Sequence, residues 1–346
     1  MKAAVTGASG LVGGHVVRAF ARAGHDVRAV VRATSRTREL AGTELAVADL
    51  GRPARLRAAF EGCDVVVHCA GAFSYAEDTR EVNVAGTEAV LLAAADAGVN
   101  RLVVTSSSVT CGAGEDDDPV LDGMPAYFAA KAEQEALALR LAGELALEVV
   151  VACPTVVIGG PDHRLVPSNA LLVRYLLDPL RTTFPGGGNL VAARDVGDGH
   201  LLLAEHGVPG RRYLLGGENL TWRRIHELVS ELCGTHGPGL TATHTSAYVG
   251  ASVLELAARL TGGPALSTRA EAATIGRRFW YGHERAAALG YAPMPVRRAL
   301  AGALSWLITS DHVPRPVRAW LRPLPEVYEA RELFPAPPPR VVPPPA

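Results

Sequence analysis

The feature that most constrains the fold of this sequence is a series of short, valine-rich runs separated by longer segments rich in alanine and leucine. The short apolar runs are residues 3–5, 27–31, 45–47, 65–68, 102–105 and 149–152. Runs of this length are typical of strands that are buried on both faces of a sheet. The segments between them, residues 11–23, 53–60, 82–97 and 125–141, have helical composition. The alternation predicts an α/β fold with a doubly wound parallel sheet.

The pattern changes after Pro154, where loops rich in glycine and proline alternate with shorter elements. Helices are expected around residues 221–233 and 251–260. We therefore expect a first domain over residues 1–155 and a smaller lobe over residues 156–333, interleaved with the last strands of the sheet. Proline dominates residues 334–346, which predicts an extended arm; a motif for a proline-binding domain is the alternative.

Composition excludes several classes of partner. The formal net charge is −1, and no cluster of Lys and Arg forms a long basic stripe of the kind that binds nucleic acid. The sequence shows neither a signal peptide nor an apolar run long enough to span a bilayer. The five cysteines have no metal-ligand spacing and suggest reduced, buried thiols. We expect a cytoplasmic protein that binds no metal, nucleic acid or membrane.

A glycine-rich loop, Thr-Gly-Ala-Ser-Gly-Leu-Val-Gly at residues 6–13, joins the first strand to the first helix. Its glycines permit a tight turn, a close approach of a pyrophosphate to the backbone, and close packing of helix on sheet. The helix N-terminus supplies free N–H groups for the phosphates. This context predicts a Rossmann-type dinucleotide site. The residues expected to bind the dinucleotide here are Gly7, Ser9, Gly10, Leu11 and Val12.

The end of the second strand indicates which dinucleotide binds. An NAD site usually carries Asp or Glu there, whereas this chain has Val30, Val31 and then Arg32. A cation without a carboxylate suits the 2′-phosphate of NADP(H). Arg32 is therefore predicted to contact that phosphate; the alternatives are a solvated arginine and an NAD site.

The ends of the third and fourth strands are expected beside the adenosine. Asp49 is placed to accept a hydrogen bond from the adenine amino group, and the helix that begins at Pro53 gives it an alternative role as an N-cap. Leu50 follows it. Ala70 lies in a run of small residues that would let the cofactor approach closely.

Tyr127 and Lys131 are one helical turn apart, so their side chains point to one side of the predicted helix. We expect the ammonium to lower the pKa of the phenol and to suit it for general acid–base chemistry. Hydroxyl side chains at residues 105–108 close the fifth strand, at the edge of the sheet where ligands bind in such folds. One of these hydroxyls is expected to orient a substrate oxygen.

With these motifs in this order, followed by Arg194-Asp195-Val196-Gly197-Asp198, the chain resembles extended short-chain dehydrogenases/reductases of the NAD-dependent epimerase/dehydratase family. The similarity covers roughly residues 1–310. It is nearest the dihydroflavonol reductase-like branch, and residues 213–221 resemble hopanoid-associated sugar epimerases. The resemblance implies that Ser107 is the catalytic serine, that Pro154 and the following segment lie against the nicotinamide, and that helices 82–97 and 125–141 form a homodimer.

Two departures from the family pattern bear on the reaction. Ser108 and Val109 stand where family dehydratases carry Asp and Glu, and Ala192 stands where many epimerases carry His. We therefore expect a ketoreductase that uses NADP(H) and acts on a small-molecule ketone or alcohol, with Ser107, Tyr127 and Lys131 as its catalytic residues. The alternatives are a nucleotide-sugar epimerase with tightly bound NAD and a regulator that senses dinucleotide without chemistry.

Three further features concern the surroundings of the site. The acidic run at residues 115–118 is expected to be a solvated loop, with a gate for cationic substrates as the alternative. Trp222 and Trp280 are expected to pack within the lobe. Asn83 is expected either to pin a turn or to help a proton relay.

Overall fold

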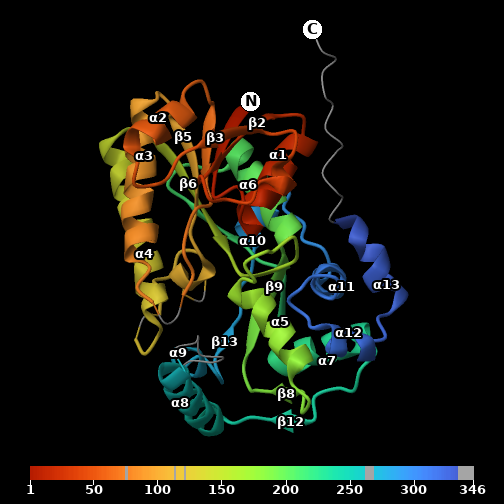
Figure 1. Cartoon of the computed structure of the whole chain (residues 1–346). Helices are drawn as coiled ribbons and strands as arrows, with labels where there is room; N and C mark the ends of the chain where they lie inside the picture. The colour runs from red at the N-terminus through yellow and green to blue at the C-terminus, as the bar shows by residue number, and fades with distance from the viewer. Residues whose placement is uncertain (75–76, 113, 121, 262–268, 334–346) are drawn as a thin grey trace, which may run out of the picture.

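The computed structural model describes residues 1–333 except 75–76, 113, 121 and 262–268, so the predicted tail at 334–346 lies outside the described residues. Its main body is a seven-stranded parallel sheet in the order β10-β6-β5-β4-β1-β2-β3 (Figure 1). The strands are β1 (Lys2–Thr6), β2 (Asp26–Val31), β3 (Glu44–Val47), β4 (Val65–His68), β5 (Arg101–Thr105), β6 (Glu148–Pro154) and β10 (Arg212–Leu215). The predicted doubly wound α/β fold is confirmed.

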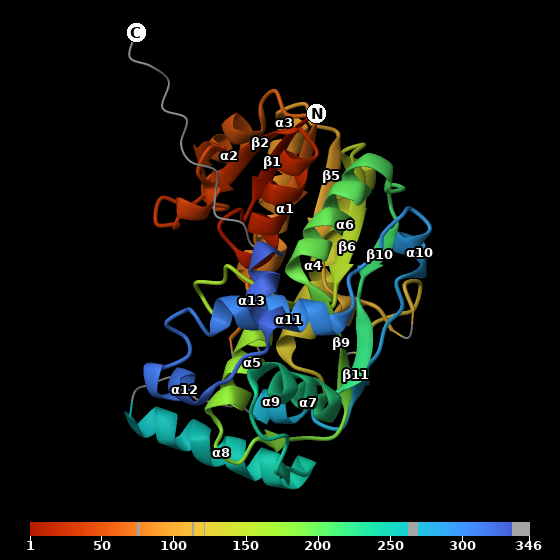
Figure 2. The same ribbon diagram turned by 90° about the vertical axis from the view of Figure 1, so that its right-hand side faces the viewer.

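Helices cover both faces of this sheet, as Figures 1 and 2 show. One face packs on α1 (Leu11–Arg22) and α6 (Ala193–His206), and the other on α2 (Pro53–Phe60), α3 (Gly86–Asp96) and α4 (Ala126–Glu144). Successive residues of β4 alternate between the two cores: Val65 and Val67 belong to one, and Val66 to the other. The strands are valine-rich because neither face meets water.

The structure corrects two of the predicted helices. The one predicted at 82–97 begins as a single π-helical turn, η2 (Glu81–Ala85), before α3. Buried Asn83 in this turn donates to Ala72 O at 2.9 Å and accepts from Ala72 N at 2.8 Å, so it pins the loop after β4. The helix predicted at 251–260 begins earlier, as α8 (His244–Thr261), because the Thr243 hydroxyl accepts a hydrogen bond from Ser246 N and caps it.

The lobe has its own apolar core around β9 (Gly187–Ala192). This strand pairs with β7 (Val156–Ile158), β11 (Glu218–Thr221) and β13 (Arg278–Phe279). The helices that contribute to the core are α5 (Pro167–Leu177), α7 (Trp222–Cys233), α11 (Val296–Leu307) and α13 (Pro325–Glu329). The remaining elements are β8 (Thr182–Thr183), β12 (Leu240–Thr241), α9 (Arg269–Ala272), α10 (Glu284–Ala287), α12 (Arg315–Trp320), η1 (Arg38–Leu40), η3 (Ser108–Thr110) and η4 (Ala330–Leu333).

The chain passes between sheet and lobe more than once. It leaves the sheet after β6, builds β7, α5 and β9 of the lobe, and then returns through α6 and β10 (Figure 2). The carboxyl ends of β1, β4, β5 and β6 consequently face the lobe, where ligands bind in open parallel sheets. Among the helices that the structure describes, none is both long and apolar enough to span a bilayer.

Candidate active site

The glycine loop between β1 and α1 has a backbone that excludes side chains. Gly7 has a φ of +66°, and a Cβ there would lie 2.6 Å from Ala70 N. A Cβ on Gly13 would collide with Gly7 O. Only glycine at both positions lets the loop turn tightly and lets α1 lie close to the end of β4.

The start of α1 fits the phosphates of a dinucleotide. No side chain caps this helix, so its first N–H groups are left for a ligand. Residues 9–13 line a cavity of about 860 Å³ between the sheet and the lobe. A helix N-terminus that opens into such a cavity favours negative charge, and the glycine cradle lets that charge approach the backbone.

Most of the predicted site residues share this cavity. The predicted residues that line it are Gly7, Ser9, Gly10, Leu11, Val12, Ser107, Tyr127, Lys131 and Pro154. They come from the carboxyl ends of β1, β5 and β6 and from the first turns of α1 and α4. The topology therefore brings the glycine loop and the tyrosine–lysine pair to one place, although more than a hundred residues separate them.

Four predicted cofactor contacts are not among the described residues that line the cavity. Arg32 is exposed, and its backbone N–H bonds Ser35 Oγ. Asp49 is exposed and accepts from Gly51 N at 3.1 Å, so it forms a local turn and does not cap α2. The Leu50 side chain packs against Gly86. The backbone of Ala70 lies next to Gly7, where it leaves no room for a side chain.

The loop after β2 nevertheless presents a cation to the cavity. Thr34, Ser35 and Arg36 line it, whereas Arg32 does not. The first acidic residue after this loop in the sequence is Glu39, and its Oε1 lies 2.6 Å from His163 Nε2. This end of the cavity therefore carries a guanidinium and hydroxyls, a combination that suits a phosphate better than a ribose diol.

Tyr127 differs from the prediction in its pKa. Its side chain is 6% exposed, and burial raises the pKa of the phenol to about 12, against the effect of a hydrogen bond with the Ser107 side chain. The expected lowering by Lys131 is wrong for this structure because desolvation is the largest influence on the phenol. The phenol ring also contacts Phe73, with 4.4 Å between the ring centroids. The two hydroxyl groups, one from the turn after β5 and one from α4, thus meet at the cavity wall.

Lys131 is a buried cation with defined partners. Its Nζ donates to Thr105 O at 3.1 Å and to Gln134 Oε1 at 2.7 Å. Burial lowers the pKa of the ammonium to about 8, and the nearby Cys153, Glu135 and Cys69 act in the opposite direction. The lysine is therefore held at the end of β5, where it faces the cavity.

Gln134 extends this contact across the site. It donates to Thr87 Oγ1 at 2.8 Å, and His68 Nε2 lies 3.0 Å from the same hydroxyl. The other ring nitrogen of His68 lies 2.8 Å from Thr6 Oγ1 at the end of β1. A continuous chain of hydrogen bonds therefore joins Lys131 to the first residue of the glycine loop.

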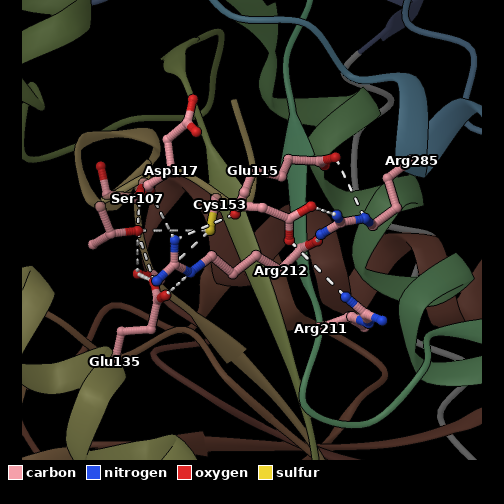
Figure 3. Close-up of polar contacts among 11 residues, drawn as sticks. Ser107, Glu115, Asp117, Glu135, Cys153, Arg211, Arg212 and Arg285 are labelled. Carbon is pink, nitrogen blue, oxygen red and sulfur yellow. Dashed lines mark hydrogen bonds and ion pairs between the residues drawn. The ribbon is translucent and has the colours of Figure 1, made fainter. Parts of the chain in front are cut away.

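The acidic run after the serine turn is only partly solvated, which corrects the prediction. Asp116, Asp117 and Asp118 are exposed as expected, but Glu115 is half-buried and accepts from Leu214 N at 2.7 Å. Glu115 also pairs with Arg285 at 3.5 Å (Figure 3). The run anchors its loop to the edge strand β10, so it does not act as an open gate.

Comparison with known proteins agrees with this geometry. A sequence profile for the NAD-dependent epimerase/dehydratase family matches residues 3–216. The chain belongs to this family. It is an NAD(P)-dependent oxidoreductase, and the resemblance to extended short-chain dehydrogenases/reductases is confirmed.

Two curated relatives are reductases by name. The chain is 31% identical to a putative dihydroflavonol 4-reductase of Synechocystis, over 89% of this chain and 95% of the relative. It is also 31% identical to a 4-hydroxy-2-methyl-3-oxo-4-farnesyl-3,4-dihydroquinoline-1-oxide ketoreductase of Stigmatella aurantiaca, over 62% of this chain and 68% of the relative. A nucleoside-diphosphate-sugar epimerase from Pseudomonas aeruginosa shares the fold, with a TM-score of 0.75, 24% identity and coverage of 90% of this chain and 99% of that one.

The wall of the cavity on the lobe side was not predicted from the sequence. Its aromatic residues include Tyr175, Phe184, Trp222 and His226. Tyr175 and His226 stack with 4.2 Å between ring centroids, and Phe184 lies 5.5 Å from Trp222. Trp222 thus contributes both to the lobe core, as expected, and to the cavity. Apolar residues in a sequence give no sign of whether they will face a core or a cavity.

Two polar residues were also missed, although their spacing could have indicated them. Gln134 and Glu135 follow Lys131 by three and four residues, so both lie on its side of α4. Both are buried. A polar pair three and four residues after a candidate catalytic lysine is the sequence pattern that could have predicted these two residues.

Proposed function

We propose that this enzyme is an NADP(H)-dependent ketoreductase that acts on a small ketone with a largely apolar body. The observation that carries the proposal is the hydrogen bond between the Ser107 and Tyr127 side chains at the wall of the cavity that the glycine loop also lines. Two hydroxyls that meet there can both reach one carbonyl oxygen.

Each catalytic residue has a separate role in this proposal. Tyr127 donates its proton to the carbonyl oxygen as reduction proceeds; a pKa of about 12 keeps the phenol protonated at neutral pH and supports the role of acid. Ser107 donates a hydrogen bond to the same oxygen and orients it. Lys131 holds a positive charge beside the developing alkoxide.

The glycine loop and the start of α1 would hold the pyrophosphate of the dinucleotide. When bound, the nicotinamide supplies the hydride for the carbonyl carbon. Arg36, with Ser35, is assigned to the 2′-phosphate, and the absence of a carboxylate among the described cavity-lining residues of that loop favours NADP(H) over NAD(H). Pro154 is assigned to the nicotinamide side of the cavity.

The substrate class follows from the lobe side of the cavity. Phe184, Trp222 and Ile275 line it, together with the small Ala247 and Ala251 of α8. The buried His226 is neutral at physiological pH because burial lowers its pKa to about 4. Such a wall favours an apolar or aromatic body over a nucleotide sugar. Among the curated relatives, the quinoline ketoreductase and a 2-alkyl-3-oxoalkanoate reductase carry names consistent with this class.

A single substitution tests the assigned acid. Tyr127→Phe should lower kcat for NADPH-dependent ketone reduction by about 10³-fold, because the proton donor is lost while the ring remains. The Kd for NADPH, measured by fluorescence, should change little. Tyr328→Phe is the matched control, because Tyr328 is exposed and is not one of the cavity residues described above.

Full activity in Tyr127→Phe would reject the assigned role. Purified protein that retains NAD tightly and oxidises no NADPH with any ketone would instead favour the epimerase alternative. The predicted homodimer and cytoplasmic location remain predictions; light scattering tests the dimer.

A further inference from the structure

A carboxylate is buried directly behind the serine turn. Glu135 of α4 is 2% exposed and lies one helical turn beyond Lys131, on the same side of the helix. It is not one of the described residues that line the cavity, so no substrate atom is expected to touch it. A charge buried in this way is strongly unfavourable unless hydrogen bonds and an ion pair compensate it.

The partners of Glu135 bracket the predicted catalytic serine. Its Oε2 lies 2.6 Å from Ser106 Oγ and 2.7 Å from Thr110 Oγ1. Thr110 Oγ1 is also 2.8 Å from the backbone carbonyl of Ser107. The carboxylate therefore contacts the residue before Ser107 and the residue that closes the turn after it.

Arg212 of the edge strand β10 fixes Glu135 in turn. The two form an ion pair, and Arg212 Nη1 also lies 3.3 Å from Glu115 O and 3.2 Å from Asp117 O (Figure 3). The guanidinium thus connects the carboxylate with the loop that follows the serine turn. One cation therefore contacts both the loop and α4.

We propose that Glu135, held by Arg212, is a positioning residue that locks the turn carrying Ser107 to the helix carrying Tyr127 and Lys131. The inference rests on the proposed function, because it explains how the Ser107 and Tyr127 hydroxyls are kept close enough to bind one carbonyl oxygen. Ser107 is on the strand side of the site and Tyr127 on the helix side. Glu135 is a buried residue of the same helix, and its carboxylate contacts Ser106 and Thr110, which bracket Ser107 in the turn.

The charge of Glu135 also acts on Lys131. The titratable groups around the ammonium are Cys153 of β6, Cys69 after β4, Glu135 of α4 and His68 of β4. His68 is neutral because burial lowers its pKa to about 3. Glu135 raises the pKa of Lys131 against the effect of burial, so loss of its negative charge should lower that pKa further.

The test begins with Glu135→Gln, which keeps the shape and removes the charge. The kcat for ketone reduction should fall by about 10- to 100-fold, the range that misplacement of a catalytic group by about 1 Å produces. The Kd for NADPH should stay within about twofold, since the phosphate site is at the far end of the cavity. The basic limb of the pH profile should move to lower pH, in step with the Nζ titration of Lys131 observed by NMR.

A matched control separates positioning from general stability. Arg101 at the amino end of β5 donates to the carbonyls of Ala204, Leu203 and Gly207, far from the serine turn at the carboxyl end of the same strand. Arg101→Met should lower Tm at least as much as Glu135→Gln, and it should leave kcat and the pH profile unchanged. Ser106→Ala combined with Thr110→Val removes the same two contacts from the turn side and tests the proposal if Glu135→Gln does not fold.

The outcomes are distinct. Unchanged kcat in Glu135→Gln, or in the Ser106 and Thr110 double variant, would overturn the inference while the proposed function stands. Loss of kcat with an unshifted pH profile and an equal loss in Arg101→Met would reduce Glu135 to a stabilising residue and also overturn it. A wild-type protein that reduces no ketone would overturn the proposed function, and the Lys131 titration would still measure the effect of Glu135.

Discussion

The two ends of the cavity are built from different parts of the polypeptide. At the cofactor end, the backbone of residues 7–13 forms the surface, and glycine is required because a Cβ would meet other backbone atoms. At the lobe end, the surface consists of aromatic side chains such as Phe184 and Trp222. A surface made of backbone is fixed by the fold, whereas one made of side chains can change with single substitutions. This difference explains how one fold can keep its cofactor and vary its substrate.

The largest effect is expected where the backbone forms the site. Gly13→Ala places a methyl group against Gly7 O, and overpacking of this kind costs about 1–3 kcal/mol. Binding of NADPH should weaken by about 100-fold at the upper end of that range. Isothermal titration calorimetry measures the change. Gly143→Ala is the control, because a Cβ at Gly143 of α4 meets no atom within 4 Å; tight binding by Gly13→Ala would remove the contrast between the two ends.

A smaller effect is expected at the rim of the cofactor end, where the surface is formed by a side chain and not by the backbone. Arg36→Ala should raise the Kd for NADPH about 10-fold and leave that for NADH unchanged, since only NADPH carries the 2′-phosphate. Arg32→Ala should change neither, because Arg32 is not among the described cavity-lining residues. The reverse result would restore the role predicted for Arg32 from the sequence.

At the lobe end, substitution should change substrate preference and leave cofactor binding intact. Trp222→Ala should raise KM for a bulky aryl ketone about 5- to 10-fold, consistent with about 1–1.5 kcal/mol for a lost aromatic contact. KM for a small aliphatic ketone and the Kd for NADPH should change little. Trp320→Ala serves as the control because Trp320 is 81% exposed. An equal rise in KM for both ketones would show that the wall does not select by size.

The smallest effect concerns stability at the lobe end. Burial lowers the pKa of His226 from 6.5 to about 4, so the folded state binds its proton less readily than the unfolded state. Stability is therefore lost as pH falls below 6.5, by about 1.4 kcal/mol per pH unit until the folded pKa is reached. His226→Phe should reduce the drop in Tm between pH 7.5 and pH 5.5 by about 1–2 °C.

His206→Gln is the control for this last prediction, because the His206 side chain is 61% exposed. An unchanged drop in Tm for His226→Phe would mean that His226 is not held neutral by burial. The histidines at the cofactor end, His15, His68 and His200, shift in the same direction and should add to the drop in the wild type.

Local features account for what the sequence predicted well. The strands at residues 2–6 and 65–68 could be predicted because both faces of each strand are buried. Burial on both faces favours a continuous run of valine and alanine, which is visible in the sequence. Tyr127 and Lys131 were paired because helical geometry alone places residues four apart on one side. The start of α8 was missed because its first turn is polar, and only the hydrogen bond to Thr243 reveals the cap.

Predictions that required distant contacts fared less well. The pKa of Tyr127 was expected to fall because Lys131 is near in sequence, but burial in the folded protein, where the ring contacts Phe73, raises it. Arg32 was assigned to the 2′-phosphate because it directly follows the second strand, whereas Arg36, four residues further on, is the one that lines the cavity. In the sequence Glu135 is one of several polar residues in a helix; its partners, Ser106 in the turn after β5 and Arg212 of β10, are brought to it only by the fold.

The sequence by itself determined the alternation of strands and helices, the glycine loop and the tyrosine–lysine spacing, because each depends on residues within one or two turns of chain. The tertiary structure decided which arginine lines the cavity, how burial shifts the pKa of Tyr127 and Lys131, and which aromatic rings line the lobe side of the cavity. These properties depend on desolvation and on contacts between residues far apart in the chain, and both arise only when the chain is folded.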